Sequence, residues 1–102
     1  MSREKRRARQ EFRQGVLDRD GHRCVICGVQ PGDDGLDAHH IIDRHDMPNG
    51  GYVKENGVTL CHDCHPLAER EHQGLDPVPG LSRAELFAAI GSSEEEARHA
   101  DR

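Results

Sequence analysis

Four cysteines form two Cys-x-x-Cys pairs, Cys24 with Cys27 and Cys61 with Cys64. Two thiolates separated by two residues can bind one metal ion, and two such pairs complete the tetrahedral shell of four sulfurs that structural zinc prefers. The stretch between the pairs (28–60) is longer than the about 15–20 residues of a compact zinc ribbon, so the spacing predicts an inserted segment. We therefore expect a structural Zn²⁺ bound by all four cysteines.

Two other interpretations of the cysteines are open at this point. The pairs could be reduced and free of metal, or the stretch CHDCH (61–65) could attach a c-type haem with His65 as its axial ligand. The haem interpretation leaves the first cysteine pair unexplained, and the N-terminus lacks the apolar run of a secretory signal. We expect a soluble, cytoplasmic protein, and in the cytoplasm clustered cysteines more often bind metal than form disulfides.

The stretch LDAHHIIDRHD (36–46) places His39 and His40 side by side, directly before two isoleucines. A solvated loop does not need the isoleucines and a plain core strand does not need the histidines, so the combination indicates a site. An imidazole can bind a divalent ion or, with a pKa near neutral, accept a proton. Adjacent side chains of a regular strand point to opposite faces. We therefore expect the backbone to bend if both rings serve one group.

The elements that must position these residues follow from local patterns. Strong helix formers and a short apolar stripe predict a helix over 3–19. Short strands are expected over 36–42 and 57–61, the second rich in β-branched residues. Residues 62–74 predict a second helix, with a proline in its first turn and a glycine where a C-terminal cap belongs.

The C-terminal quarter contains a further helix signal. Residues 75–80 predict a linker, after which Ser82 and Glu85 form a capping-box pattern that predicts a short helix over 82–91. The polar stretch after Gly91 is expected to be a tail that frays.

Composition limits the classes of protein that the chain can belong to. Its 102 residues, 33% of them hydrophobic, predict one small domain whose apolar core is marginal without a further staple. No stretch approaches the ~20 apolar residues of a membrane span. The net charge of −5 argues against a nucleic-acid partner, but eight of the 14 Lys and Arg residues lie in the first 23 positions and partly restore that possibility.

Five elements occur in order within residues 12–71: the first cysteine pair, His39-His40-Ile41, Asn56, the second cysteine pair and His65. In this order the chain resembles the HNH endonucleases, a ββα-metal nuclease family. The stretch AHHIIDRHDMPNGGYVKENGVTLCHDCHPLAE (38–69) is similar to the small phage and bacterial branch whose motif lies between two Cys-x-x-Cys pairs.

The resemblance implies an α+β fold built on a small ββα-metal domain. We expect that domain at 24–74, preceded by a basic N-terminal helix (1–23) and followed by a linker, a short helix and a polar tail (75–102). The structural zinc would stabilise this frame, and zinc binding can contribute on the order of 10 kcal/mol of apparent folding free energy.

The resemblance also implies the roles of the histidines. His39 and His65 would bind one divalent ion (Mg²⁺, Mn²⁺, Ni²⁺ or Zn²⁺), and His40 would be the general base that takes a proton from water. Glu69 lies one helical turn after His65 and is the candidate third ligand, although it could be a solvated helix acid. Asn56 would tie the loop between the strands and orient the base, approach the metal, or form an ordinary Asn-Gly turn.

The function implied is that of a metal-dependent endonuclease that hydrolyses DNA phosphodiester bonds and leaves 5′-phosphate and 3′-hydroxyl ends. The resemblance also implies that the cytoplasm is that of a bacterium or a phage-infected host cell. The alternative is a zinc-stabilised DNA-binding module without catalytic activity. Double-stranded DNA is the expected partner, contacted at its phosphates by Arg6, Arg7 and Arg9. Cutting both strands from one site would call for a homodimer or another phage or bacterial DNA-processing partner.

Overall fold

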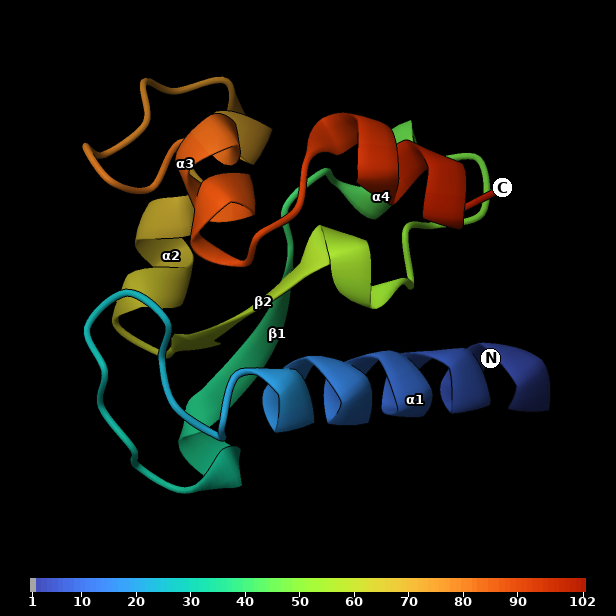
Figure 1. Ribbon diagram of the computed structural model, residues 1–102, viewed down its shortest axis with the longest axis horizontal. Helices are drawn as coiled ribbons and strands as arrows, with labels where there is room; N and C mark the ends of the chain where they lie inside the picture. The colour runs from blue at the N-terminus through green and yellow to red at the C-terminus, as the bar shows by residue number, and fades with distance from the viewer. Residues whose placement is uncertain (1) are drawn as a thin grey trace.

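The computed structural model describes residues 2–102, so the predicted 1–23 segment begins one residue outside it. Helix α1 spans Arg3–Arg19, as the pattern predicts, and begins with the Ser2 hydroxyl accepting from the backbone N–H of Lys5. Its buried residues, Phe12, Val16 and Leu17, lie on one face. That face packs on the strands, while the N-terminal turns extend beyond them (Figure 1).

Strands β1 (Leu36–His40) and β2 (Gly57–Cys61) form a two-stranded antiparallel sheet. β2 is buried along its whole length, and Gly57 shows how closely α1 approaches it. A Cβ atom at Gly57 would lie 2.5 Å from a methyl carbon of Val16, so only glycine allows this packing. β1 ends at His40 rather than at residue 42, because the next two residues turn away from the ladder.

The segment between the strands contains two 3-10 turns, η2 (Arg44–Asp46) and η3 (Lys54–Asn56), and a third, η1 (Asp33–Gly35), precedes β1. After β2 the chain forms α2 (Cys64–Ala68) and then η4 (Glu71–Gln73). The single helix predicted over 62–74 is therefore two shorter pieces, and Gly74 ends them in a left-handed conformation with φ 74°. Together β1, β2 and α2 confirm the predicted α+β class.

Two helices follow. α3 (Arg83–Ala89) has the predicted capping box between Ser82 and Glu85. The expected polar tail instead forms α4 (Glu94–Ala100) and is anchored at its end by Asp101, which is 4% exposed. The Asp101 carboxylate accepts hydrogen bonds from the backbone N–H groups of Asn49 and Gly51, so α4 holds the loop between the strands.

One hydrophobic core joins all of these elements. It receives Leu17 from α1, Val58 and Leu60 from β2, Phe87 from α3 and Ala97 from α4. Among the helices of residues 2–102, none has both the length and the apolar character needed to cross a membrane.

Candidate active site

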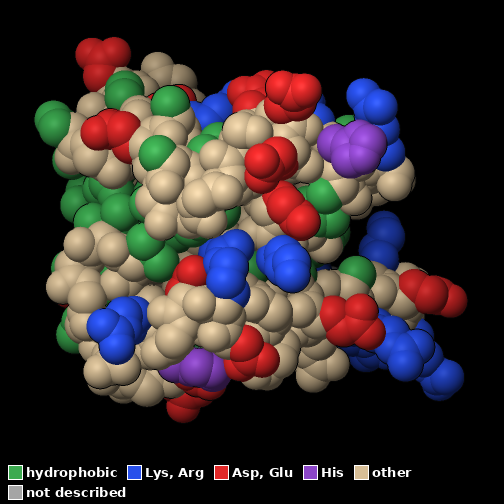
Figure 2. Space-filling model, in the orientation of Figure 1, with side chains coloured by type: hydrophobic (Ala, Val, Ile, Leu, Met, Phe, Trp, Pro, Cys, Tyr) green, Lys and Arg blue, Asp and Glu red, His purple; other side chains and the backbone are tan. Residues whose placement is uncertain are grey.

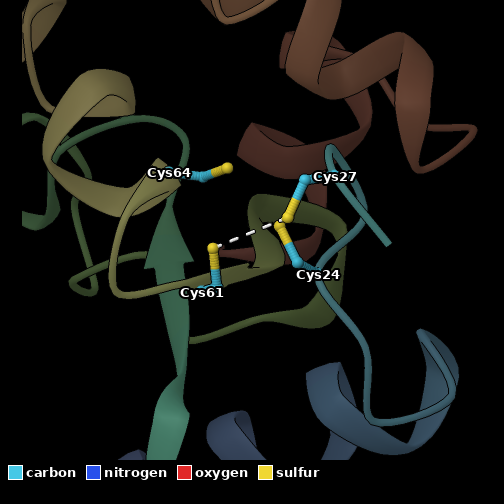
Figure 3. Close-up of side chains that lie close together, drawn as sticks. All are labelled: Cys24, Cys27, Cys61 and Cys64. Atoms are coloured by element: carbon cyan, nitrogen blue, oxygen red, sulfur yellow. Dashed lines mark hydrogen bonds between the residues drawn. The ribbon is translucent and has the colours of Figure 1, made fainter. Parts of the chain in front are cut away.

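The four cysteines converge, although 33 residues separate the two pairs. Cys24 and Cys27 lie in the turn after α1, Cys61 ends β2 and Cys64 begins α2, and their side chains point toward one another (Figure 3). All four sulfur atoms lie within 4.8 Å of one another. The Cys27 and Cys61 sulfurs are 3.7 Å apart, far longer than a disulfide bond, and all four thiols are free.

The thiols have very different tendencies to ionise. Burial opposes ionisation of Cys24, but hydrogen bonds from backbone N–H groups outweigh it and lower the pKa of Cys24 to about 7. Burial and the neighbouring thiols raise the pKa of Cys64 well above its usual range. Without a cation, this cluster cannot hold four negative thiolates so close together. The four cysteines are therefore suited to bind a divalent ion such as Zn²⁺, and they are the residues for which the sequence predicted a structural zinc.

A second cluster brings together His39 of β1 with His65 and Glu69 of α2 and its C-terminal end. Nε2 of His65 lies 2.9 Å from Oε1 of Glu69, and Nδ1 of His39 lies 3.3 Å from the same oxygen. One donor atom from each residue fits within 4.8 Å of the others. The three residues predicted as ligands of the divalent ion can therefore meet around a common centre.

His39 carries the clearest indication that this cluster can hold a cation. Its side chain is 1% exposed, yet Nε2 has no polar partner and Nδ1 only approaches Oε1 of Glu69 at 3.3 Å. A buried imidazole without a partner is costly, and a metal ion would satisfy it. Burial lowers the pKa of His39, while contact with His39 lowers the pKa of Glu69 to about 2 despite its burial. The cluster thus offers imidazole nitrogens and one ionised carboxylate, a donor set that fits a divalent ion.

Asp37, which was not among the residues predicted from the sequence, fixes the orientation of His65. Its Oδ2 atom lies 2.9 Å from Nδ1 of His65, so that Nε2 of the same ring faces Glu69. Such a carboxylate on the far nitrogen of a metal-binding histidine sets the ring's tautomer and orientation. The alternation of side chains along a strand could have indicated Asp37, because Asp37 and His39 lie two residues apart and so share one face of β1.

His40 occupies a different environment from His39. Its ring stacks on Phe12 of α1, with ring centres 4.5 Å apart, and meets the edge of Tyr52 at 4.9 Å. Burial, with help from His39 and Arg44, lowers the pKa of His40 to about 4. Nε2 of His40 is buried and has no hydrogen-bond partner. The ring is therefore neutral at pH 7 and keeps a free nitrogen that can accept a proton.

The predicted bend between the two histidines is absent. The strand ladder is regular through both, with His39 opposite Val58 and His40 opposite Gly57, and the chain bends only afterwards. Of the two rings, His40 borders a hollow of about 200 Å³, whose other lining residues are Ala38, Asp43, Arg44, His65, Glu69 and His72. His39 does not line this hollow and lies behind it, against His65 and Glu69, two residues that do line it.

Asn56 is 0% exposed, and its amide is fully used by backbone partners. Its oxygen accepts from the N–H of Ile42, and its nitrogen donates to the carbonyl oxygens of Ile42 and Gly51. Both polar atoms of the amide therefore already have a backbone partner. Asn56 ties the end of β1 to the loop, as one of the sequence hypotheses required.

Lys and Arg side chains gather at the N-terminal end of α1, which extends beyond the rest of the molecule (Figure 2). Arg6 and Arg7 lie on the outer part of the helix, where Arg7 pairs with Glu11 at 3.4 Å. Arg9 lies closer to the site, since its Nε donates to the Tyr52 hydroxyl at 3.4 Å. Arg44, Arg9 and Tyr52 share an open groove with His40, and the two arginines lower the pKa of Tyr52.

One family model matches the part of the chain that contains both clusters. Residues 24–71 match the family model described as HNH endonuclease, a span that contains both cysteine pairs and the His39, His40, Asn56, His65 and Glu69 side chains. No curated protein and no solved structure gave a significant match. This match confirms the resemblance seen in the sequence for residues 24–71.

Proposed function

We propose that this chain, whose residues 24–71 belong to the HNH endonuclease family, is a metal-dependent endonuclease that hydrolyses phosphodiester bonds of double-stranded DNA. The observation that carries the proposal is that His39 is buried beside His65 and Glu69 with its Nε2 unpartnered, while a neutral His40, also with an unpartnered Nε2, borders the hollow that His65 and Glu69 line. A purely structural histidine pair would not leave two ring nitrogens buried without partners.

In this proposal the two histidines divide the chemistry. His39, His65 and Glu69 would hold one divalent ion, which when bound would supply Lewis-acid stabilisation of the charge that develops on the phosphate and on the departing 3′-oxygen. Nε2 of His40 accepts the proton of the attacking water. Phe12 and Tyr52 restrict the His40 ring by contact on its face and edge, so the base is held in place before substrate arrives.

The four cysteines act on stability rather than on the reaction. We assign them a structural Zn²⁺ that joins the turn after α1 to the junction of β2 and α2. Since Cys64 begins the helix that contains His65, this ion also fixes the helix that presents two of the candidate ligands.

DNA contact is assigned to arginines around the groove. A net charge of −5 means that binding depends on a local concentration of positive charge and weakens with salt. Arg9 and Arg44 border the groove next to His40 and can reach phosphates close to the cut. Arg6 and Arg7 lie farther along α1 and would contact the DNA backbone farther from the cut than Arg9 and Arg44 do.

Nicking of supercoiled plasmid tests the proposal. Zinc-loaded protein should nick plasmid when Mg²⁺, Mn²⁺, Ni²⁺ or added Zn²⁺ is supplied, and His39→Ala should lose both this activity and its binding of the second ion. Plasmid binding without nicking in every metal would instead identify a DNA-binding module. A Soret band in the purified protein would reinstate the haem interpretation.

The plasmid assay also tests whether two copies of the protein act together on one DNA molecule. One site cuts one strand in each encounter, so linear plasmid formed without prior accumulation of the nicked circle would indicate two copies acting together. Nicked circles that appear first would indicate a single acting copy.

A further inference from the structure

His72 lies in η4, next to the proposed cation site, and the sequence analysis assigned it no role. Its side chain is 9% exposed. Nδ1 lies 3.0 Å from Oε2 of Glu69, and Nε2 lies 3.0 Å from the carbonyl oxygen of Ile41. Its ring also stacks on His39, with ring centres 5.1 Å apart and planes 21° apart.

These contacts divide the two oxygens of the Glu69 carboxylate. Oε1 faces the nitrogens of His39 and His65, at 3.3 and 2.9 Å, whereas Oε2 is occupied by His72. The carboxylate can therefore rotate only by breaking the contact with His72. Through the Ile41 carbonyl, this contact also links the helix that contains Glu69 to the end of β1.

We propose that His72 is a positioning residue that holds Glu69 so that a single oxygen, Oε1, faces the cation. The inference rests on the proposed metal site and extends it. A carboxylate with both oxygens free could contact an ion through both, but a catalytic site needs positions left open for water and substrate oxygens. By occupying Oε2, His72 keeps those positions open.

The contact with His39 gives His72 a second way to affect the same site. His39 lies between His72, stacked on it, and His65, whose ring meets it edge-on at 5.0 Å. The His72 ring therefore limits the tilt of one candidate ligand and holds the carboxylate of another. An ordinary buried histidine would fill core volume without touching two donors of one site.

Metal titration of zinc-loaded protein tests this role without relying on activity. Isothermal titration with Mn²⁺ alone would compare wild-type protein with His72→Phe, which keeps an aromatic ring against His39 but removes both ring nitrogens. We expect Mn²⁺ affinity to fall about 10–100-fold, the usual effect of losing a group that orients a metal ligand. His72→Gln keeps an amide donor and should recover part of the loss. The exposed His99→Phe is the matched control and should bind as wild type does.

A double-mutant cycle separates positioning from general stability. In a Glu69→Ala background, His72→Phe should no longer weaken Mn²⁺ binding, because the carboxylate that it positions is gone. If His72→Phe fails to fold, as judged by zinc content and circular dichroism, His72→Leu and His72→Gln complete the cycle.

The outcomes distinguish this inference from the function on which it rests. If wild-type protein binds no Mn²⁺ beyond its zinc, the proposed metal site and the role of His72 both fall. If wild-type protein binds Mn²⁺ and the His72 variants bind it equally well, the role of His72 is refuted and the metal site stands. If His72→Phe lowers Mn²⁺ affinity equally in the wild-type and Glu69→Ala backgrounds, positioning through the carboxylate is also refuted.

Discussion

Replacing Asn56 by alanine removes a buried amide whose hydrogen bonds no other side chain can make in its place. The amide makes three hydrogen bonds to the backbone of Ile42 and Gly51, at 2.9, 3.0 and 3.3 Å. In Asn56→Ala the N–H and carbonyl of Ile42 and the carbonyl of Gly51 lose these partners. Both residues are buried, so water does not readily replace the amide.

The size of the effect follows from these groups. A buried donor or acceptor left without a partner costs about 1–3 kcal/mol. Three such groups, one of them bonded only weakly at 3.3 Å, give a predicted loss of about 3–5 kcal/mol in the free energy of unfolding. The whole free energy of unfolding of a small domain is only about 5–15 kcal/mol, so the variant should be close to unfolding at room temperature.

Urea unfolding of zinc-loaded protein, followed by circular dichroism, measures this loss. Gln14→Ala removes an exposed amide on α1 and should change the free energy of unfolding by no more than about 0.5 kcal/mol. A loss below about 1 kcal/mol in Asn56→Ala would refute the structural role of the amide. If nicking were abolished in such a stable variant, Asn56 would instead act in the reaction itself.

Three further predictions follow from other parts of the structure. A strong chelator should unfold the domain, since about 10 kcal/mol of zinc-linked folding energy exceeds what the small core supplies, and a folded apo-protein by circular dichroism would contradict this. Arg44→Gln, in a His40→Ala background that binds DNA without cutting it, should reduce the slope of log affinity against log salt by about 0.9 for one lost phosphate contact, whereas Arg102→Gln should not. Hydrogen bonds to Asp33 and Asp18 raise the pKa of His22. Because the raised value belongs to the folded state, the stability advantage of wild-type protein over His22→Gln should be complete below pH 6.5 and disappear at higher pH; an advantage that grew with pH would reverse the sign.

Much of the frame could be predicted because its signals are local. The helix over 3–19 and the strand over 57–61 have the predicted bounds, since helix formers and β-branched residues there agree with the tertiary packing. The clustering of the two cysteine pairs and of His39 with His65 followed from their order in the motif rather than from any local pattern.

The missed features depend on contacts between polar groups distant in sequence. α4 was expected to be a tail because the sequence after Gly91 is polar. In the structure the one buried residue of α4 is Ala97, and its anchor is the charged Asp101. The bonds from Asp101 to the loop at Asn49 and Gly51 have no sequence signal. His72 was missed for the same reason, since only the fold brings it to Glu69.

The most direct test of the account compares wild-type protein with His40→Ala at saturating Mn²⁺, measuring the single-turnover nicking rate and Mn²⁺ binding in the same preparations. A general base outside the metal site predicts that nicking falls about 10²–10⁴-fold while Mn²⁺ affinity and zinc content stay at the wild-type level. Nicking at the wild-type rate in a folded, metal-loaded His40→Ala variant would contradict the account.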